Sequence, residues 1–67
     1  MMRFQDGQII EAVREAQRLA DLSGTRYVVQ HREGESGLFV ESIYMANPPC
    51  ILEVCKPCVS PWREGAA

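Results

Sequence analysis

The chain has 67 residues, of which 46% are hydrophobic and 24% charged, with a formal net charge of −2. This length allows a single domain with a small core, and chains of this size are often held together by a metal, disulfides or a partner subunit. Seven Lys and Arg against nine Asp and Glu leave no basic footprint, which argues against direct binding to nucleic acid. The apolar stretches are too short for a membrane span.

The N-terminal segment 1–6 lacks the apolar run of a signal peptide, which predicts a cytoplasmic protein. In a reducing compartment the three cysteines are expected to be thiols or metal ligands, since disulfides are rare there. The odd number of cysteines agrees, because one thiol stays unpaired in a monomer.

Residues 6–22 carry the pattern of an amphipathic helix. Ile9, Val13, Ala16 and Ala20 fall on one face, and charged residues fall on the opposite face. Asp6 is expected to accept hydrogen bonds from the free N–H groups of the first turn. Gly24 is expected to end the helix, because the residue after a helix often needs a positive φ.

Three strands are predicted after this helix, over residues 25–32, 38–44 and 50–55, because these segments are rich in β-branched and aromatic residues. A turn over 33–37 joins the first two strands into a hairpin, and both faces of the second strand are expected to be partly covered. The predicted fold class is α+β, with one N-terminal helix packed on a three-stranded antiparallel sheet in the order αβββ. We expect one domain over 1–62 and a frayed tail over 63–67.

The pattern Cys50-x4-Cys55-x2-Cys58 is the strongest chemical signal in the chain. Together with His31, the single histidine, these thiols could form a Cys3His zinc site that ties the C-terminal segment to the hairpin. Against this, Cys50 and Cys55 have opposite parity in one strand and point to opposite faces. We therefore expect no cofactor, and keep a zinc-stabilised module as the alternative.

The sequence does not favour an enzyme. Cys55-Lys56-Pro57-Cys58 has the spacing of a redox motif, but Pro61 comes too soon for the helix that such motifs open. The glycines at 34 and 37 lie in a hairpin turn and not between a strand and a helix, so no phosphate loop is present. A chain this short also has little volume for a substrate pocket in addition to its core.

Carboxylates mark the helix and the hairpin tip, where they are expected to meet a positively charged partner surface. Trp62 is a candidate anchor, because tryptophan is common in interface hot spots. The predicted partner-binding residues are Glu11, Glu15, Asp21, Glu33, Glu35 and Trp62.

The N-terminal helix, the Tyr27-Val28-Val29 strand, the glycine-containing hairpin and the Leu38-Phe39-Val40 strand together resemble small phage or mobile-element proteins, among them anti-CRISPR proteins. The resemblance covers roughly residues 8–45 and rests on size and element order. It implies a non-enzymatic inhibitor in the host cytoplasm that binds a host protein complex, at a basic nucleic-acid-binding surface of that complex. A monomer and a homodimer are both compatible with the sequence.

Overall fold

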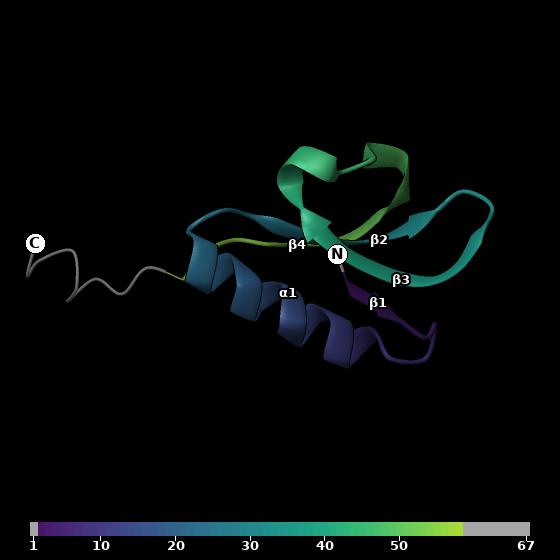
Figure 1. The fold of residues 1–67 in the computed structure, drawn as a ribbon, viewed down its shortest axis with the longest axis horizontal. Coiled ribbons are helices and arrows are strands. Elements are labelled where there is room, and N and C mark those ends of the chain that lie inside the picture. Colours follow the sequence, from purple (N-terminus) through teal and green to yellow (C-terminus); the bar gives the residue numbers. More distant parts are fainter. Residues whose placement is uncertain (1, 59–67) are drawn as a thin grey trace, which may run out of the picture.

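One helix packs on a four-stranded antiparallel sheet in the computed structural model, which describes residues 2–58 (Figure 1). The predicted α+β class is confirmed. The sheet order is β1-β3-β2-β4, and the helix covers one face. The predicted tail over 63–67 and the domain boundary at 62 lie outside the described residues. The elements are β1 (Met2–Phe4), α1 (Ile9–Ser23), β2 (Tyr27–Arg32), β3 (Glu35–Ser42), the single 3-10 turns η1 (Ile43–Met45) and η2 (Pro48–Cys50), and β4 (Ile51–Cys55).

The predicted order αβββ misses β1, so the observed order is βαβββ. β1 pairs antiparallel with β3, with Met2 opposite Val40 and Phe4 opposite Leu38. Three residues are too few to show an alternating pattern, so only their pairing with β3 reveals the strand. Gly37 of β3 makes the close approach possible, because a Cβ at this position would lie 2.7 Å from the carbonyl oxygen of Phe4.

The helix begins at Ile9 and not near Asp6. The Asp6 carboxylate instead accepts a hydrogen bond of 3.1 Å from the backbone N–H of Gly37, which ties the β1–α1 connection to β3. The predicted helix end is confirmed: Gly24 has a φ of 73° and its N–H donates to the carbonyl of Ala20 at 2.8 Å.

The β2–β3 hairpin is tighter than predicted, because Arg32 pairs with Glu35 and only Glu33 and Gly34 form the loop. The end of the second predicted strand also differs. Pairing stops at Ser42, and the N–H of Ile43 then donates to the carbonyl of Arg26 at 2.9 Å. Residues 43–45 therefore leave the sheet as the turn η1.

Small side chains form the helix side of the core. Ala12, Ala16 and Ala20 are fully buried, whereas Ile9, predicted to lie on the buried stripe, is 40% exposed. Alanine lets the helix axis approach the sheet closely, and the larger side chains of this layer come from the strands. The strand contribution is Val29, Leu38, Val40 and Cys55.

Both faces of β3 are covered, as expected from the sequence. On the face away from α1, Phe39 is 1% exposed and lies beneath the guanidinium groups of Arg3 and Arg32, 5.6 and 4.9 Å from its ring centroid. The rest of this face is covered by residues 43–50 (Figure 1).

Enlarging the alanine layer should destabilise the fold. Ala16→Leu adds a branched side chain where α1 and the sheet are in direct contact, and overpacking of this kind costs about 1–3 kcal/mol. Urea denaturation followed by circular dichroism measures the loss. Glu11→Leu, on the exposed side of the same helix, is the control and should change stability by less than about 0.5 kcal/mol. Equal losses in the two variants would contradict the close packing of α1.

Candidate functional site

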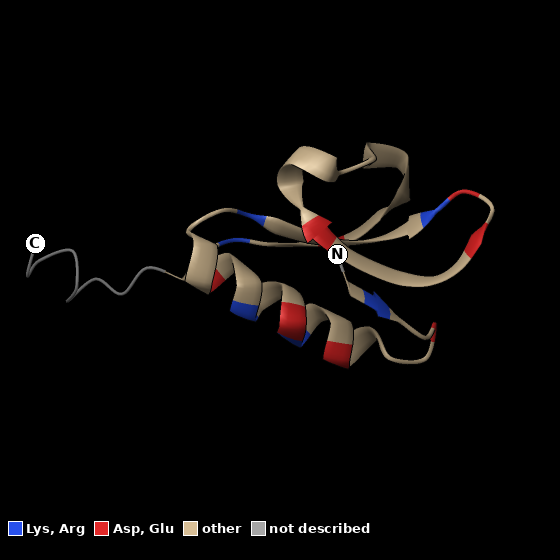
Figure 2. Ribbon diagram, in the orientation of Figure 1, with Lys and Arg blue, Asp and Glu red and all other residues tan. Residues whose placement is uncertain are grey.

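The predicted acidic residues do not gather into one face. Along α1, Glu11 and Glu15 alternate with Arg14 and Arg18 (Figure 2). Glu15 pairs with Arg18, and this hydrogen bond lowers the pKa of the Glu15 carboxyl. The helix surface therefore presents charges of both signs.

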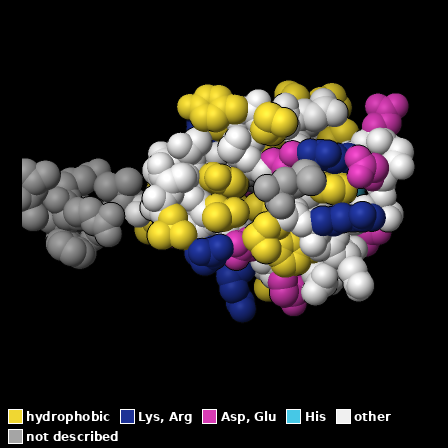
Figure 3. All heavy atoms as spheres, viewed as in Figure 1, with side chains coloured by type: hydrophobic (Ala, Val, Ile, Leu, Met, Phe, Trp, Pro, Cys, Tyr) yellow, Lys and Arg dark blue, Asp and Glu magenta, His cyan; other side chains and the backbone are white. Residues whose placement is uncertain are grey.

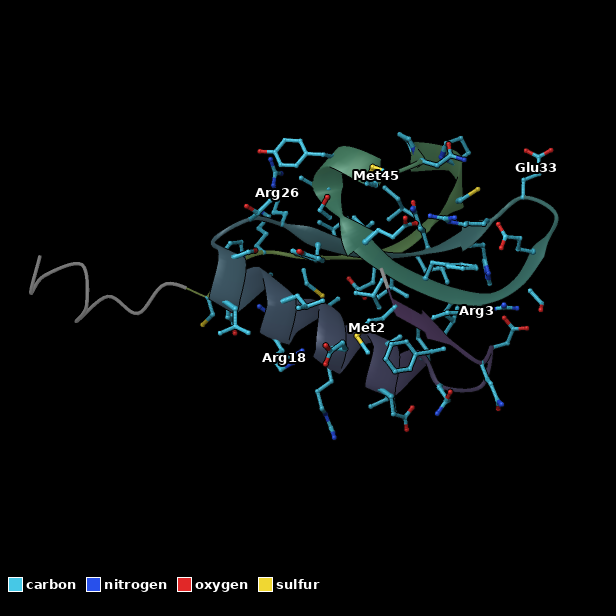
Figure 4. The ribbon with its side chains drawn as sticks, viewed as in Figure 1. Met2, Arg3, Arg18, Arg26, Glu33 and Met45 are labelled. Atoms are coloured by element: carbon cyan, nitrogen blue, oxygen red, sulfur yellow. The ribbon has the colours of Figure 1, made fainter. Side chains whose placement is uncertain are left out.

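The remaining predicted acids have separate surroundings. Asp21 accepts hydrogen bonds from Gln17 at 2.9 Å and from the backbone N–H of Cys58 at 2.8 Å, so it anchors the chain after β4. Glu35 lies 3.9 Å from Arg32. Glu33 points away from the body at the tip of the β2–β3 hairpin, at the opposite end of the molecule from the C-terminal end of α1, the helix that contains Asp21 (Figures 1 and 4). Trp62 lies outside the described residues.

The four residues of the hypothetical zinc site have different environments. Cys50 is half-buried and its Sγ accepts a hydrogen bond from Asn47 Nδ2 at 3.4 Å. Cys55 is buried at the end of β4, whereas Cys58 and His31 are exposed. Within residues 2–58, no three His, Cys, Asp or Glu side chains converge as ligands for a metal ion.

The thiols and the imidazole do not form a nucleophile–base pair. The Cys55 thiol donates to the carbonyl of Val13 at 3.7 Å, and burial raises the pKa of this thiol, with the charges of Glu53 and Asp21 adding to the effect. His31 Nδ1 instead lies 3.1 Å from the carbonyl oxygen of Gly37. A thiol with a raised pKa is a poor nucleophile.

A buried polar network holds residues 43–50 against the sheet. Gln30 is 2% exposed; its Nε2 donates to Glu41 Oε2 at 2.6 Å and to the carbonyl of Met45 at 3.1 Å, and its Oε1 accepts from the N–H of Asn47 at 2.8 Å. Glu41 is 5% exposed and also pairs with Arg32. The Gln30 side-chain amide thus bonds a carbonyl and an N–H of the loop backbone, as the backbone of a neighbouring strand would.

The loop held in this way presents a surface without charge, which we call the loop surface: the exposed side chains of Tyr44, Met45, Pro48 and Pro49. Tyr44 is 84% and Met45 63% exposed. Ser42–Leu52 contains no charged residue, and Figure 2 shows the loop free of red and blue. Hydrophobic side chains follow this side of the molecule in Figure 3. Exposed apolar groups that gather in this way mark contact sites for other molecules.

Basic residues border the loop surface near the end of the helix. Arg26 and Lys56, together with Tyr44 and Pro57, line a hollow of about 680 Å³. Neither cation forms an ion pair within residues 2–58. An apolar centre with a charged margin is the usual composition of a protein interface.

The loop leads directly into β4, which is an edge strand. β4 pairs only with β2, and no strand in the described part of the chain pairs with its outer side. Leu52 and Val54 of this strand are 47% and 39% exposed. The sequence-based prediction did not include Tyr44, Met45, Leu52 and Val54 among the candidate contact residues. For Tyr44, Met45 and Leu52 the sequence signal was the long stretch without charged residues after Glu41.

No protein-family model, curated protein or solved structure matches this chain significantly. In residues 2–58, no helix combines the length and the apolar character needed to cross a membrane.

Glu41→Gln should destabilise the protein at neutral pH. Hydrogen bonds from Arg32 and Gln30 lower the pKa of the Glu41 carboxyl, so the charged form stabilises the fold above its usual pKa and this contribution disappears as the pH falls through the lowered value. We expect Glu41→Gln to lower the free energy of unfolding by about 1–3 kcal/mol at neutral pH. This difference from the native chain should become smaller as the pH falls toward about 3. Urea denaturation at both pH values measures this.

Glu15→Gln is the matched control, because Glu15 pairs with Arg18 within α1 and a solvent-screened pair of this kind contributes little to stability. A Glu41→Gln variant as stable as the Glu15→Gln variant at neutral pH would contradict the role given to the network.

The cysteines should differ in their rates of alkylation. Cys58 is exposed, whereas Cys55 is buried with a raised pKa, so iodoacetamide should modify Cys58 faster by at least about tenfold. Mass spectrometry of quenched samples gives both rates, and the difference should vanish in denaturant. Equal rates in the folded protein would contradict the burial of Cys55.

Proposed function

We propose that this protein is a small, non-enzymatic interaction module that acts by binding another protein through its loop surface. The observation that carries the proposal is the exposure of Tyr44 and Met45 on a loop without charged residues. Tyrosine and methionine are enriched at protein interfaces, and charged residues are depleted from interface centres. Exposing them to water is otherwise unfavourable.

The attachment of the loop supports this role. Gln30 bonds both Met45 and Asn47, and Glu41 in turn positions Gln30, so the loop surface rests on the most buried part of the sheet. A preformed contact surface loses less conformational freedom on binding than a flexible one. The basic margin formed by Arg26 and Lys56 favours a partner with acidic residues around an apolar patch.

The expected inhibitor of a host complex is one form of this function. In that form Glu33, which is exposed at the hairpin tip and has no ion pair within residues 2–58, is the acidic group most available to a basic partner. We retain the phage-type inhibitor as a prediction for the biological role, and assign the main contact to the loop surface, because the acids on α1 are interleaved with arginines.

The loop surface should be required for partner capture. The tagged native chain is used to capture proteins from a lysate of the cells that produce it. The same capture is carried out with the double variant Tyr44→Ser, Met45→Ser, and the retained proteins are compared. We expect a specific protein to be retained by the native chain and reduced at least about tenfold with the variant, since truncating an interface anchor costs 1 kcal/mol or more. Quantitative mass spectrometry measures retention.

The control is Ile10→Ser, which removes a comparably exposed apolar side chain in the first turn of α1, on the other side of the sheet from the loop. It should capture the same protein as the native chain. The proposal fails if nothing is retained reproducibly, or if the loop variant and the control capture equally well while both remain folded by circular dichroism.

A further inference from the structure

A second recognition feature lies at the opposite side of β4 from the loop surface. A hollow of about 540 Å³ is lined by two carboxylates, one imidazole and three apolar side chains: Asp6, Glu53, His31, Ile9, Leu38 and Leu52. Within residues 2–58, neither Asp6 nor Glu53 forms an ion pair. The hollow thus combines negative charge with an apolar lining.

A bulge in β4 places Glu53 at this hollow. The register of β2 and β4 shifts between Val29 opposite Glu53 and Gln30 opposite Ile51, which leaves Leu52 as the extra residue. Bulges on edge strands re-aim side chains, and here Leu52 and Glu53 both line the hollow. The carboxylate therefore lies beside the free edge of β4.

The free edge offers backbone hydrogen-bonding groups to a further strand. Pairing with β4 of a second copy fits poorly there, because β4 carries no cation to meet Glu53. A symmetric antiparallel pair would set Glu53 against the other Glu53 or against an apolar residue such as Cys55. A strand that carries a basic side chain opposite Glu53 would instead bring a positive charge to the carboxylates. The negative charge at the hollow therefore favours a basic partner strand over a second β4.

We infer that the outer edge of β4 binds an extended segment of a partner protein, whose arginine or lysine side chain enters the hollow between Asp6 and Glu53. Main-chain hydrogen bonds to β4 supply sequence-independent affinity, and the hollow supplies specificity. The aliphatic part of the basic side chain contacts Ile9, Leu38 and Leu52. This inference rests on the proposed function, since it names a second contact and the chemistry of the same partner.

The probe is a short synthetic peptide that alternates threonine with valine and carries arginine at its centre. Titration into the isotope-labelled protein should shift the amide NMR signals of β4 and of the residues around the hollow, and leave those of Tyr44 and Met45 unchanged. A peptide with glutamine at its centre should bind more weakly by about tenfold. Methylation of the peptide backbone nitrogens that face β4 should abolish binding, because strand pairing needs their N–H groups.

Charge reversal tests the role of Glu53 directly. Glu53→Lys should reverse the preference, so that a peptide with glutamate at its centre binds better than the arginine peptide. Glu33→Lys is the matched control, with the same change in net charge at the exposed hairpin tip, and should keep the preference for arginine.

Equal binding of the arginine and glutamine peptides, absence of shifts in β4, or an unchanged preference in Glu53→Lys would each overturn the inference. A concentration-dependent dimer in light scattering that Leu52→Lys abolishes would also overturn it, by assigning the edge to a second copy. If the peptide does not bind β4 but capture through Tyr44 and Met45 succeeds, the proposed function stands and only this inference fails. If the capture fails, the peptide titration can still be interpreted by itself.

Discussion

The hydrogen bonds of the Gln30 side chain hold the loop over residues 43–50 on the sheet, and the proposed loop surface depends on them. The Gln30 side-chain amide bonds the backbone of Met45 and Asn47, as a neighbouring strand would. It also donates to Glu41, which in turn pairs with Arg32. No buried side-chain nitrogen or oxygen in the described residues lacks a partner, which is the condition for a polar network in a small core. The network therefore adds to the backbone bond from Ile43 to Arg26 in holding residues 43–50 on the sheet.

This arrangement explains how so short a chain covers both faces of its sheet. One face receives the helix, whose alanines at 12, 16 and 20 allow close contact with Val29 and Val40. In the described part of the chain, no second α-helix lies on the other face, which is closed instead by arginine side chains over Phe39 and by the loop bonded to Gln30. The need for a metal or disulfide staple, suggested by the length, is reduced because polar and cation–π contacts supply part of the second layer.

The two proposed contact sites differ in the charges that border them. The loop surface is apolar and bordered by Arg26 and Lys56, whereas the hollow beside β4 is bordered by Asp6 and Glu53. β4 links them, since the loop leads into it and the hollow lies along it. A partner that contacts both would meet opposite charges at the two ends, which fixes its orientation as well as its identity. The net charge of −2 does not reveal that cations border one site and carboxylates border the other.

Local sequence patterns determined the α+β class, the helix that ends at Gly24, and the strands that became β2, β3 and β4, because these depend on side-chain periodicity and on a glycine with positive φ. The tertiary structure alone decided the pairing of β1, the bond from Gly37 to Asp6, and the burial of Gln30 and Glu41. Polar residues in a strand are normally expected to face water, and only partners distant in the sequence make their burial favourable. The stretch without charged residues after Glu41 marks the loop in the sequence, but only its bonds to Gln30 place it on the sheet with Tyr44 and Met45 exposed.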